Sequence, residues 1–436
     1  MHLAAATREP LGIPPPAPPT LSLPRPMGSH RLWAKIQLAV QDLQMRHKDL
    51  WIALTAVLLA GFGSGWGRSC PGVAIKGDDS QELDRKKPRP ALSWRACGQQ
   101  KAAWYKSPEA LRIADNVLLY QAGIGGWYKN DGSIHPSGNA ATELLSEPEK
   151  KRFKESLTLR KHPCTLDNDA THSELRYLAK VYAASGERKY KAGFLKGAEY
   201  LLKAQYPSGG WPQFYPLRPG YSSRITFNDG AMIGAIEVLD NIANRRQPYD
   251  LADEPLRTRC KDAVDKGIQC ILKCQIVVGG RKTAWCQQHD EITLDPAQGR
   301  VSENPSISGA ESVGVARYLM SIEEPSDGVI EAVKGAVDWF AKVRITGVRV
   351  VTVKDDTLPG GRDRRVVADP KATPIWARYY EIGTNRPLYI EKGVARYSLA
   401  ELSHKKRIGH TWIGGRWPER LLEVEYPAWR ARVSKE

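Results

Sequence analysis

Amphipathic helical stretches follow one another along the chain from about residue 93, and strand-like patterns are few. The first helix is predicted to begin at Ser107, where a capping side chain precedes a proline and an acid, and apolar residues then recur on one face. Further helices are predicted over about residues 170–184, 188–205, 229–243, 257–275, 308–322 and 328–343. The clearest strand covers residues 348–354, before a turn-like Leu-Pro-Gly-Gly sequence. The pattern predicts an all-α fold with long loops and a few short strands.

Three of the predicted helices end with the same feature. Gln121 and Gln205 are each followed by a Gly-Gly-Trp turn, and Gln275 is followed by Gly-Gly with Trp285 a little later. The glutamines are 84 and 70 residues apart, which leaves room for two helices and their loops in each unit. This spacing indicates a degenerate repeat of helical hairpins, which can stack as an open solenoid or close into a toroid. The turns then gather at one end of the helices, where they either line a shared cleft or simply end each helix with a packed tryptophan.

The first 92 residues have a different character from the rest. Residues 1–44 are rich in proline and predict no packed fold, and they are interpreted as a disordered segment or a mis-called upstream extension. Residues 45–69 begin with Met45 and a short basic stretch, continue with an apolar run and end in small residues, which is typical of a signal peptide. The apolar run is shorter than the ~17–25 residues that a spanning helix needs, so an anchor is the less favoured interpretation. A buried helix is also less favoured, because polar sequence follows the run abruptly. Residues 70–92 are interpreted as a linker and residues 93–436 as one domain, of a secreted or periplasmic protein.

Charge and aromatic content narrow the class of partner. The 436 residues carry a formal net charge of +16, and residues 1–70 contribute only +4 of it. Such a balance favours polyanions, namely nucleic acid, acidic lipid surfaces or acidic polysaccharides. The 13 Trp and 17 Tyr against 6 Phe favour a wet, sugar-binding cleft, because Trp and Tyr combine a flat apolar face with a hydrogen-bonding edge. Nucleic acid is disfavoured as a partner because the basic residues are dispersed along the sequence and no known nucleic-acid-binding motif is present.

The cysteines do not indicate a structural metal or a disulfide framework. Seven cysteines in 436 residues are sparse, and none forms the paired CxxC spacing of a zinc site. Cys270 and Cys274 lie four residues apart on a predicted helix and are expected to be small core residues on one face. One or two disulfide bridges are compatible with an exported protein, without a predicted pairing.

Two turns before predicted helices concentrate oxygen-bearing side chains. The first is Asp167-Asn168-Asp169 and the second is Asn228-Asp229-Gly230. One acid in each turn could serve only as a helix cap, for which Asp and Asn are favoured residues. Three consecutive oxygen-bearing side chains exceed what one cap requires, and hard cations such as calcium take several carboxylate and amide oxygens together. The two turns are therefore candidates for a shared metal site.

Two later segments carry the other candidate residues. A loop of about thirty residues contains His289 and Arg300, and it is longer than most compact domains tolerate without a functional cause. His289 by itself is more often a hydrogen-bonded structural histidine than a catalytic one. In the second segment, Arg378 and Arg386 lie among tryptophan and tyrosine residues. A guanidinium group can donate two hydrogen bonds to one carboxylate, and the neighbouring aromatic rings can stack on sugar rings.

These blocks together resemble a known family. Residues 93 to about 430 resemble the pectate lyases of polysaccharide lyase family ten. The resemblance is carried by many blocks in order, among them Asp167-Asn168-Asp169-Ala170-Thr171, Gly209-Gly210-Trp211-Pro212-Gln213, Thr226-Phe227-Asn228-Asp229-Gly230, Trp285-Cys286-Gln287-Gln288-His289-Asp290 and Trp376-Ala377-Arg378-Tyr379-Tyr380-Glu381. None is a short motif that recurs by chance.

The resemblance implies a fold and an activity. The fold is an α/α toroid, an incomplete α/α barrel of helical hairpins whose loops and short strands form the cleft. The activity is calcium-dependent β-elimination of α-1,4-linked polygalacturonate (pectate), which gives 4,5-unsaturated products. On this resemblance Asp167 and Asp229 look like the Ca²⁺ carboxylates, Arg300 like the base for the C5 proton and Arg386 like a clamp for a substrate carboxylate. The other substrate-binding residues implied by matching blocks are Asn168, Trp285, His289 and Arg378.

Two other functions fit the residues and stay open. A glycoside hydrolase on the same helical scaffold needs two carboxylates about 5–10 Å apart, and several acids could serve. The second alternative is not an enzyme but a non-catalytic protein that binds acidic glycans. The expected partner is the polysaccharide polygalacturonate, and the protein is expected to be a monomer, without stable membrane insertion of the mature chain.

Overall fold

The computed structural model describes residues 92–128, 140–159 and 163–434. The proline-rich segment, the signal peptide and nearly all of the linker predicted from the sequence lie outside these residues. Within the described part, no helix combines the length and the apolar character that crossing a bilayer demands.

Seven long helices form the frame of the described part, and the helices predicted from the sequence are confirmed to within about three residues at each end. They are α3 (Pro108–Tyr120), α5 (His172–Ser185), α6 (Arg188–Ala204), α7 (Ala231–Ala243), α8 (Glu254–Cys274), α9 (Glu311–Ser321) and α10 (Asp327–Lys342). The sequence analysis missed a further long helix and three short ones. These are α4 (Glu147–Leu159), α2 (Trp94–Cys97), α11 (His404–Gly409) and α12 (Tyr426–Val433).

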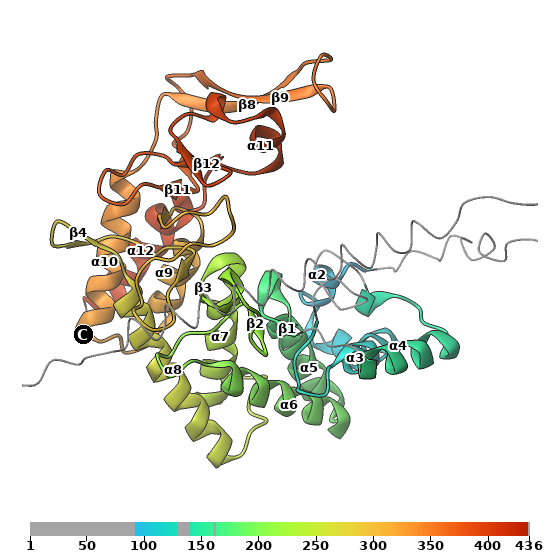
Figure 1. The fold of residues 1–436 in the computed structure, drawn as a ribbon. Coiled ribbons are helices and arrows are strands. Elements are labelled where there is room, and N and C mark those ends of the chain that lie inside the picture. The colour runs from blue at the N-terminus through green and yellow to red at the C-terminus, as the bar shows by residue number, and fades with distance from the viewer. Residues whose placement is uncertain (1–91, 129–139, 160–162, 435–436) are drawn as a thin grey trace, which may run out of the picture. The chain divides into compact units, whose positions relative to one another are not determined.

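The long helices pack in two rows. Consecutive helices form the hairpins α5–α6, α7–α8 and α9–α10, and each hairpin packs against the next (Figure 1). One row contains α5, α7 and α9, and the other contains α6, α8 and α10. The result is the expected all-α, toroid-like fold of helical hairpins, and the described residues do not close into a barrel.

The strands are short and pair only two by two within the described residues. The longest pair is β8 (Val348–Lys354) with β9 (Arg362–Ala368), which confirms the predicted strand. The other pairs join loops: β1 (Cys164–Thr165) with β2 (Phe214–Tyr215), β3 (Ile225–Thr226) with β6 (Gln288–His289), β4 (Val277–Val278) with β5 (Arg281–Lys282), β7 (Ile307–Ser308) with β11 (Tyr379–Tyr380), β10 (Trp376–Ala377) with β14 (Ile413–Gly415), and β12 (Tyr389–Glu391) with β13 (Val394–Arg396).

The repeated glutamines tie one hairpin to the next. Gln205 at the end of α6 donates from Nε2 to the carbonyl of Gly209 in its own turn at 2.9 Å and to the carbonyl of Ala263 in α8 at 2.8 Å. Gln121 makes the corresponding bonds to its own turn and to α6, and Gln275 to its own turn and to α10. A side chain that satisfies two carbonyls at once fixes the turn and the neighbouring helix together.

Glycine is required where two of these turns touch the next helix. Gly125 and Gly209 have φ values of 107° and 95°, which side chains with a Cβ rarely adopt. A Cβ at Gly125 would lie 2.3 Å from the carbonyl oxygen of Lys196, and one at Gly209 would lie 2.1 Å from that of Lys266. The backbone of the turn therefore rests directly on the backbone of the neighbouring helix.

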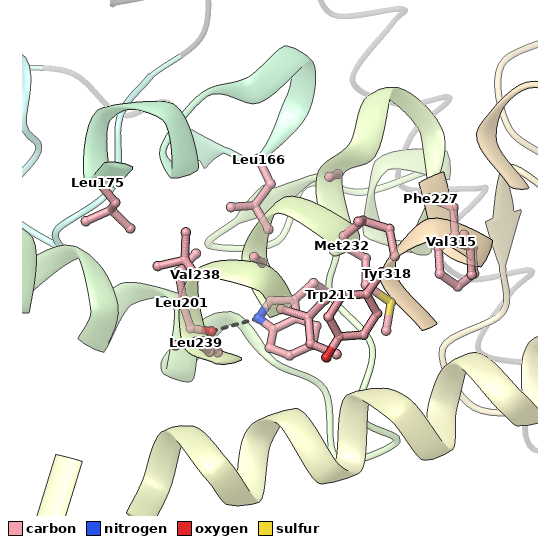
Figure 2. Close-up of a cluster of buried hydrophobic side chains, with 14 of the residues drawn as sticks. Leu166, Leu175, Leu201, Trp211, Phe227, Met232, Val238, Leu239, Val315 and Tyr318 are labelled. Carbon is pink, nitrogen blue, oxygen red and sulfur yellow. Dashed lines mark hydrogen bonds between the residues drawn. The ribbon is translucent and has the colours of Figure 1, made fainter. Parts of the chain in front are cut away.

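The tryptophans of the repeat lie in the core. Trp127, Trp211 and Trp285 have no exposed surface, and each indole N–H donates to a carbonyl of the preceding helix. Figure 2 shows Trp211 in this core with its bond to Leu201. The tryptophans are packed as the second of the two interpretations of these turns expects, in which each turn ends a helix with a buried tryptophan. Trp376 after α10 makes the same kind of bond to Phe340, so the repeat has a fourth member that the sequence analysis did not detect.

The six described cysteines are buried and carry free thiols. Cys270 and Cys274 are 0% and 2% exposed, with their sulfur atoms 3.9 Å apart on one face of α8, which confirms that they are core residues.

Replacing Gln205 with Met should test the tie between hairpins. The variant keeps the length of the side chain but leaves the carbonyls of Gly209 and Ala263 without their shared donor. Because each unpaired buried carbonyl costs about 1–3 kcal/mol, the free energy of unfolding should fall by about 2–4 kcal/mol in urea titration. Gln269→Met on the exposed face of α8 is the matched control and should stay within about 0.5 kcal/mol of the parent. A Gln205→Met protein as stable as this control contradicts the role given to the glutamines.

Candidate functional site

Three helix starts lie side by side at one end of the fold. The turn η3 (Asp167–Asp169) precedes α5, the turn η5 (Asn228–Gly230) precedes α7, and strand β7 leads into α9. Turn η5 packs against both η3 and the start of α9. The first N–H groups of a helix have no partner within it and carry a partial positive charge, so this end of the fold favours anions.

The two oxygen-rich turns have the same backbone conformation. Asn168 and Asp229, the central residues, have φ values of 51° and 50°, and the residues after them, Asp169 and Gly230, have values of 65° and 71°. Asn, Asp and Gly are the residues that tolerate this left-handed region, which explains why the turns use them. The hairpin repeat therefore places Asn168 and Asp229 at equivalent positions in adjacent units.

A large cavity at this end lies beside both turns. It has a volume of about 780 Å³, and its wall includes Asn168, Asp169 and Asp229 together with the cations Arg176 and Lys180. Asn228 donates from Nδ2 to Oδ2 of Asp229 at 2.5 Å, which holds that carboxylate at the wall. Carboxylate and amide oxygens of both turns thus face one cavity.

Asp167 lies beneath the surface of its turn in this structure. The residue is 1% exposed, its backbone N–H donates to Oγ1 of Thr165 at 3.1 Å, and it does not line the cavity. Asp169, in the same turn, does line the cavity and has a side chain that is 63% exposed. The structure therefore puts the carboxylate of Asp169 at the surface of this turn and that of Asp167 beneath it.

The second cavity, of about 360 Å³, lies on the other side of Asp229. Its wall includes Asp229, Glu311, Arg378 and Trp417. No atom lies within 4 Å of a Cβ built at Gly314, so the start of α9 leaves open space here. Asp229 belongs to both cavities, which makes it the carboxylate between them.

Strand pairing brings Arg378 to this second cavity. Strands β7 and β11 place Tyr379 opposite Ser308, and the N–H of Gly309 donates to the carbonyl of Arg378 at 2.7 Å. Nη2 of Arg378 forms an ion pair with Oε1 of Glu311.

The same guanidinium reaches the turn before α7, where Nη2 of Arg378 lies 3.4 Å from Oδ1 of Asn228. Burial by itself lowers the pKa of Arg378, but the charge of Glu311 outweighs burial and raises the pKa above its usual value. Arg378 is therefore a fixed, permanently charged group beside Asp229.

Arg300 forms a close ion pair with a buried acid. Its Nε donates to Oε1 of Glu303 at 2.9 Å, its Nη2 lies 2.7 Å from the same oxygen, and its backbone N–H donates to Oε2. The Arg300 side chain is 52% exposed and that of Glu303 is 6% exposed. Burial lowers the pKa of Arg300, but the bonds and charge of Glu303 outweigh that effect and raise it. Arg300 is thus held protonated in this state, and it does not line either cavity.

Arg386 lies on a surface loop, where it stacks on an aromatic ring. Its guanidinium is 3.4 Å from the ring centroid of Tyr397, and its Nε is 3.8 Å from Oε2 of Glu381. The side chain is 53% exposed. A half-exposed guanidinium stacked on tyrosine can bind a carboxylate, but this loop does not line the two cavities.

Trp285 and His289 lie in the interior of the fold. Both are 0% exposed. Nδ1 of His289 donates to the carbonyl of Leu294 at 2.8 Å, and Nε2 accepts from the N–H of Cys286 at 3.1 Å. Burial lowers the pKa of His289 to about 4, so its ring is neutral at physiological pH. In this structure both side chains support the long loop from inside.

Three residues at the site escaped the sequence analysis. Glu311 pairs with Arg378, Glu303 pairs with Arg300, and Trp417 lines the second cavity. Glu303 lies three residues after Arg300, a spacing that could have suggested the pair. Glu311 and Arg378 are far apart in sequence, and only the pairing of β7 with β11 brings them together.

Comparisons with known proteins give a consistent picture. A family model described as pectic acid lyase matches residues 121–422. A family 10 polysaccharide lyase from Cellvibrio cellulosa is 32% identical, with a TM-score of 0.61, over 75% of this chain and 95% of that one. A mutant of a family 10 polysaccharide lyase from the same organism, in complex with trigalacturonic acid, is also 32% identical, with a TM-score of 0.61, over 77% of this chain and 98% of that one. The search of curated proteins gave no match.

The family match covers more than half of the chain, and it includes both turns and the two arginine segments. The related structures are matched over nearly their whole length. These findings confirm the resemblance seen in the sequence. The chain belongs to the pectic acid lyase family and is a polysaccharide lyase of family ten.

Proposed function

We propose that this enzyme is a pectate lyase that cleaves α-1,4-linked polygalacturonate by calcium-dependent β-elimination. The observation that carries the proposal is the position of Asp229, between two cavities and next to both an oxygen-rich turn and the fixed guanidinium of Arg378. Membership of the pectic acid lyase family and the trigalacturonic acid bound by a related mutant support the substrate. The excess of positive charge favours a polyuronate for the same reason.

The donor atoms of the two turns fit a hard cation. Asn168, Asp169 and Asp229 supply amide and carboxylate oxygens to one cavity wall, and calcium takes oxygen ligands of these kinds. Among the described residues, no three His, Cys, Asp or Glu side chains gather into a metal-binding group. A Ca²⁺ held by these turns therefore needs further oxygens, which the carboxylates of the substrate and water can supply. When bound, the cation supplies positive charge that neutralises a uronate carboxylate.

The reaction removes a weakly acidic proton. A base takes the proton from C5 of a uronate residue, the electron pair forms the C4–C5 double bond, and the bond from C4 to the bridging oxygen breaks. Negative charge builds up on the carboxylate attached to C5, so fixed cations near that group lower the barrier. Arg378 is suited to this role because the Glu311 ion pair and burial hold its guanidinium in place before substrate arrives.

Arg300 is the proposed base, and Arg386 is the proposed clamp for a more distant carboxylate. A guanidinium with an ordinary pKa above 12 is a poor base, and Glu303 makes Arg300 poorer still in the present state. The role therefore requires that a bound cation and other guanidinium groups disfavour the protonated form when substrate is in place. Among the residues that the structure describes at the site, no side chain stands out as a general acid, and solvent is the proposed proton donor to the leaving oxygen.

The ion pairs at the site favour elimination over glycoside hydrolysis. Asp229 and Glu311 line one cavity, as a hydrolase would need, but Oε1 of Glu311 is committed to Arg378 and Oε2 accepts from the Ser308 hydroxyl. A protonated acid that is free to meet a glycosidic oxygen is the group that hydrolysis needs. Action on an extracellular polymer agrees with the signal peptide predicted at Met45, and we propose that the enzyme is exported.

The purified protein should convert polygalacturonate to products with the ultraviolet absorbance of an unsaturated uronate. Chelation with EGTA should abolish the reaction, because the turns alone do not neutralise the substrate carboxylate, and added Ca²⁺ should restore it. The continuous absorbance assay at alkaline pH measures both effects. New reducing ends that form without absorbance, and at the same rate in EGTA, would indicate a hydrolase instead.

Arg300→Lys should lower kcat by about 10²–10⁴-fold, the usual contribution of a positioned proton-transfer group. The dissociation constant for galacturonate oligomers should change less than about threefold, because the positive charge is retained. Calorimetric titration measures binding, and Arg188→Lys, on the exposed start of α6, is the matched control. An Arg300→Lys variant with ordinary turnover overturns the assignment.

Glu303→Gln should separate a base from a purely electrostatic role for Arg300. The carboxylate raises the pKa of Arg300, so its removal lowers that pKa and increases the neutral fraction at any given pH. If Arg300 is the base, the rise of kcat/KM on the alkaline side should move to lower pH. A pH profile that keeps its position while activity falls would mean that the protonated guanidinium is the working form.

A further inference from the structure

The larger cavity has a wall that the family match does not include. Helix α2 (Trp94–Cys97) lies before the matched residues 121–422, and it contributes Trp94 and Arg95 to the cavity, with Gly98 and Gln99 after it. Helix α5 contributes Lys180 and other residues to the same wall. The cavity therefore extends from the oxygen-rich turns to a short helix that is separate from them in sequence.

Helix α2 is firmly attached to α5. The indole N–H of Trp94 donates to Oγ of Ser173 at 3.1 Å, and the rings of Trp94 and Tyr177 have centroids 5.1 Å apart. Nζ of Lys180 donates to the carbonyl of Gly98 at 2.7 Å, directly after the helix. These contacts give the wall a defined position without any ligand.

The cations on this wall differ in how they are neutralised. Arg176 forms an ion pair with Glu237 at 2.6 Å. Within the described residues, Arg95 and Lys180 have no carboxylate within 4.0 Å of their charged nitrogens. Burial lowers the pKa of Lys180 and the charge of Arg176 lowers it further, so an anion at this position would relieve an unfavourable charge. Arg95 is exposed at the cavity rim.

The acids and the cations of the cavity wall come from different elements of the fold. Asp169 and Asp229 belong to the turns, whereas Arg95 and Lys180 belong to the wall made by α2 and α5. The volume of about 780 Å³ lies within the range of about 300–1,000 Å³ that ligand sites occupy. A ligand that is anionic at intervals along its length can place one carboxylate near the turns and another near these cations.

We propose that this cavity is a subsite for a second uronate residue of the polymer, in which Arg95 and Lys180 bind the sugar carboxylate. This inference rests on the proposed function, because it takes polygalacturonate as the ligand. The subsite should increase affinity for longer chains without taking part in bond cleavage. Arg95 and Lys180 are thus binding residues, and the rate of cleavage of a saturating substrate should not depend on them.

The test compares the parent enzyme with the double variant Arg95→Met/Lys180→Met. Calorimetric titration with Ca²⁺ present measures the dissociation constants of galacturonate oligomers of increasing length. The parent should gain affinity when the oligomer becomes long enough to enter the subsite. The double variant should lose about tenfold at that length and beyond, as expected when a partly exposed, charge-assisted contact is removed, and nothing for shorter oligomers. The kcat for long polygalacturonate should stay within about twofold of the parent value.

Matched controls keep the test specific. Arg188→Met/Lys334→Met removes two exposed cations from α6 and α10, and it should bind every oligomer as the parent does. Arg95→Lys/Lys180→Arg keeps both charges and should restore most of the length-dependent affinity. Methyl-esterified oligomers lack the carboxylate charge and should bind the parent and the double variant equally. Thermal unfolding of each variant checks that α2 still packs against α5.

The outcomes distinguish this inference from the proposed function. A parent that cleaves polygalacturonate, together with a double variant that binds all lengths as tightly as the parent, overturns the subsite alone. The same holds if the charge-retaining variant fails to restore binding while its fold is intact. A parent that neither binds nor cleaves any galacturonate oligomer overturns the proposed function and this inference with it.

Discussion

The rest of the structure depends on one hydrogen-bonding arrangement, in which a glutamine at the end of a helix donates to two carbonyls. One carbonyl belongs to its own turn and the other to the helix of the next hairpin, as for Gln205 with Gly209 and Ala263. The bonds are partly or fully buried, where an unpaired carbonyl is costly, so each hairpin is held in one register against the next. Because the arrangement recurs at Gln121 and Gln275, the helix starts of successive units meet at one end of the fold.

The chemistry of the site follows from that register. Adjacent units place Asn168 and Asp229 in equivalent left-handed positions, and the next unit places Glu311 beside Arg378. The ion pair between Arg378 and Glu311 is therefore formed between neighbouring units before substrate binds. Preorganised charges of this kind do not have to reorient when negative charge develops during a reaction, which is the condition for efficient electrostatic catalysis.

Much of the fold could be predicted from the sequence because local signals and global packing agree. The helix caps, the apolar periodicity and the Gln-Gly-Gly pattern all report on contacts within or between neighbouring units. The site was harder to predict, because burial decides roles there. Trp285 and His289 have residue types that suit substrate binding, yet both are enclosed by the loop that they support. The partnership of Glu311 with Arg378 depends on a two-residue strand pairing that has no sequence signature.

This scaffold is proposed to perform elimination on a uronate chain. Mass spectrometry of the products from a galacturonate oligomer of defined length tests it most directly, because elimination adds no water and hydrolysis adds one molecule. For elimination, the masses of the two products should sum to the mass of the substrate, with the unsaturated residue at one new end. Products whose masses sum to the substrate plus one water would contradict it.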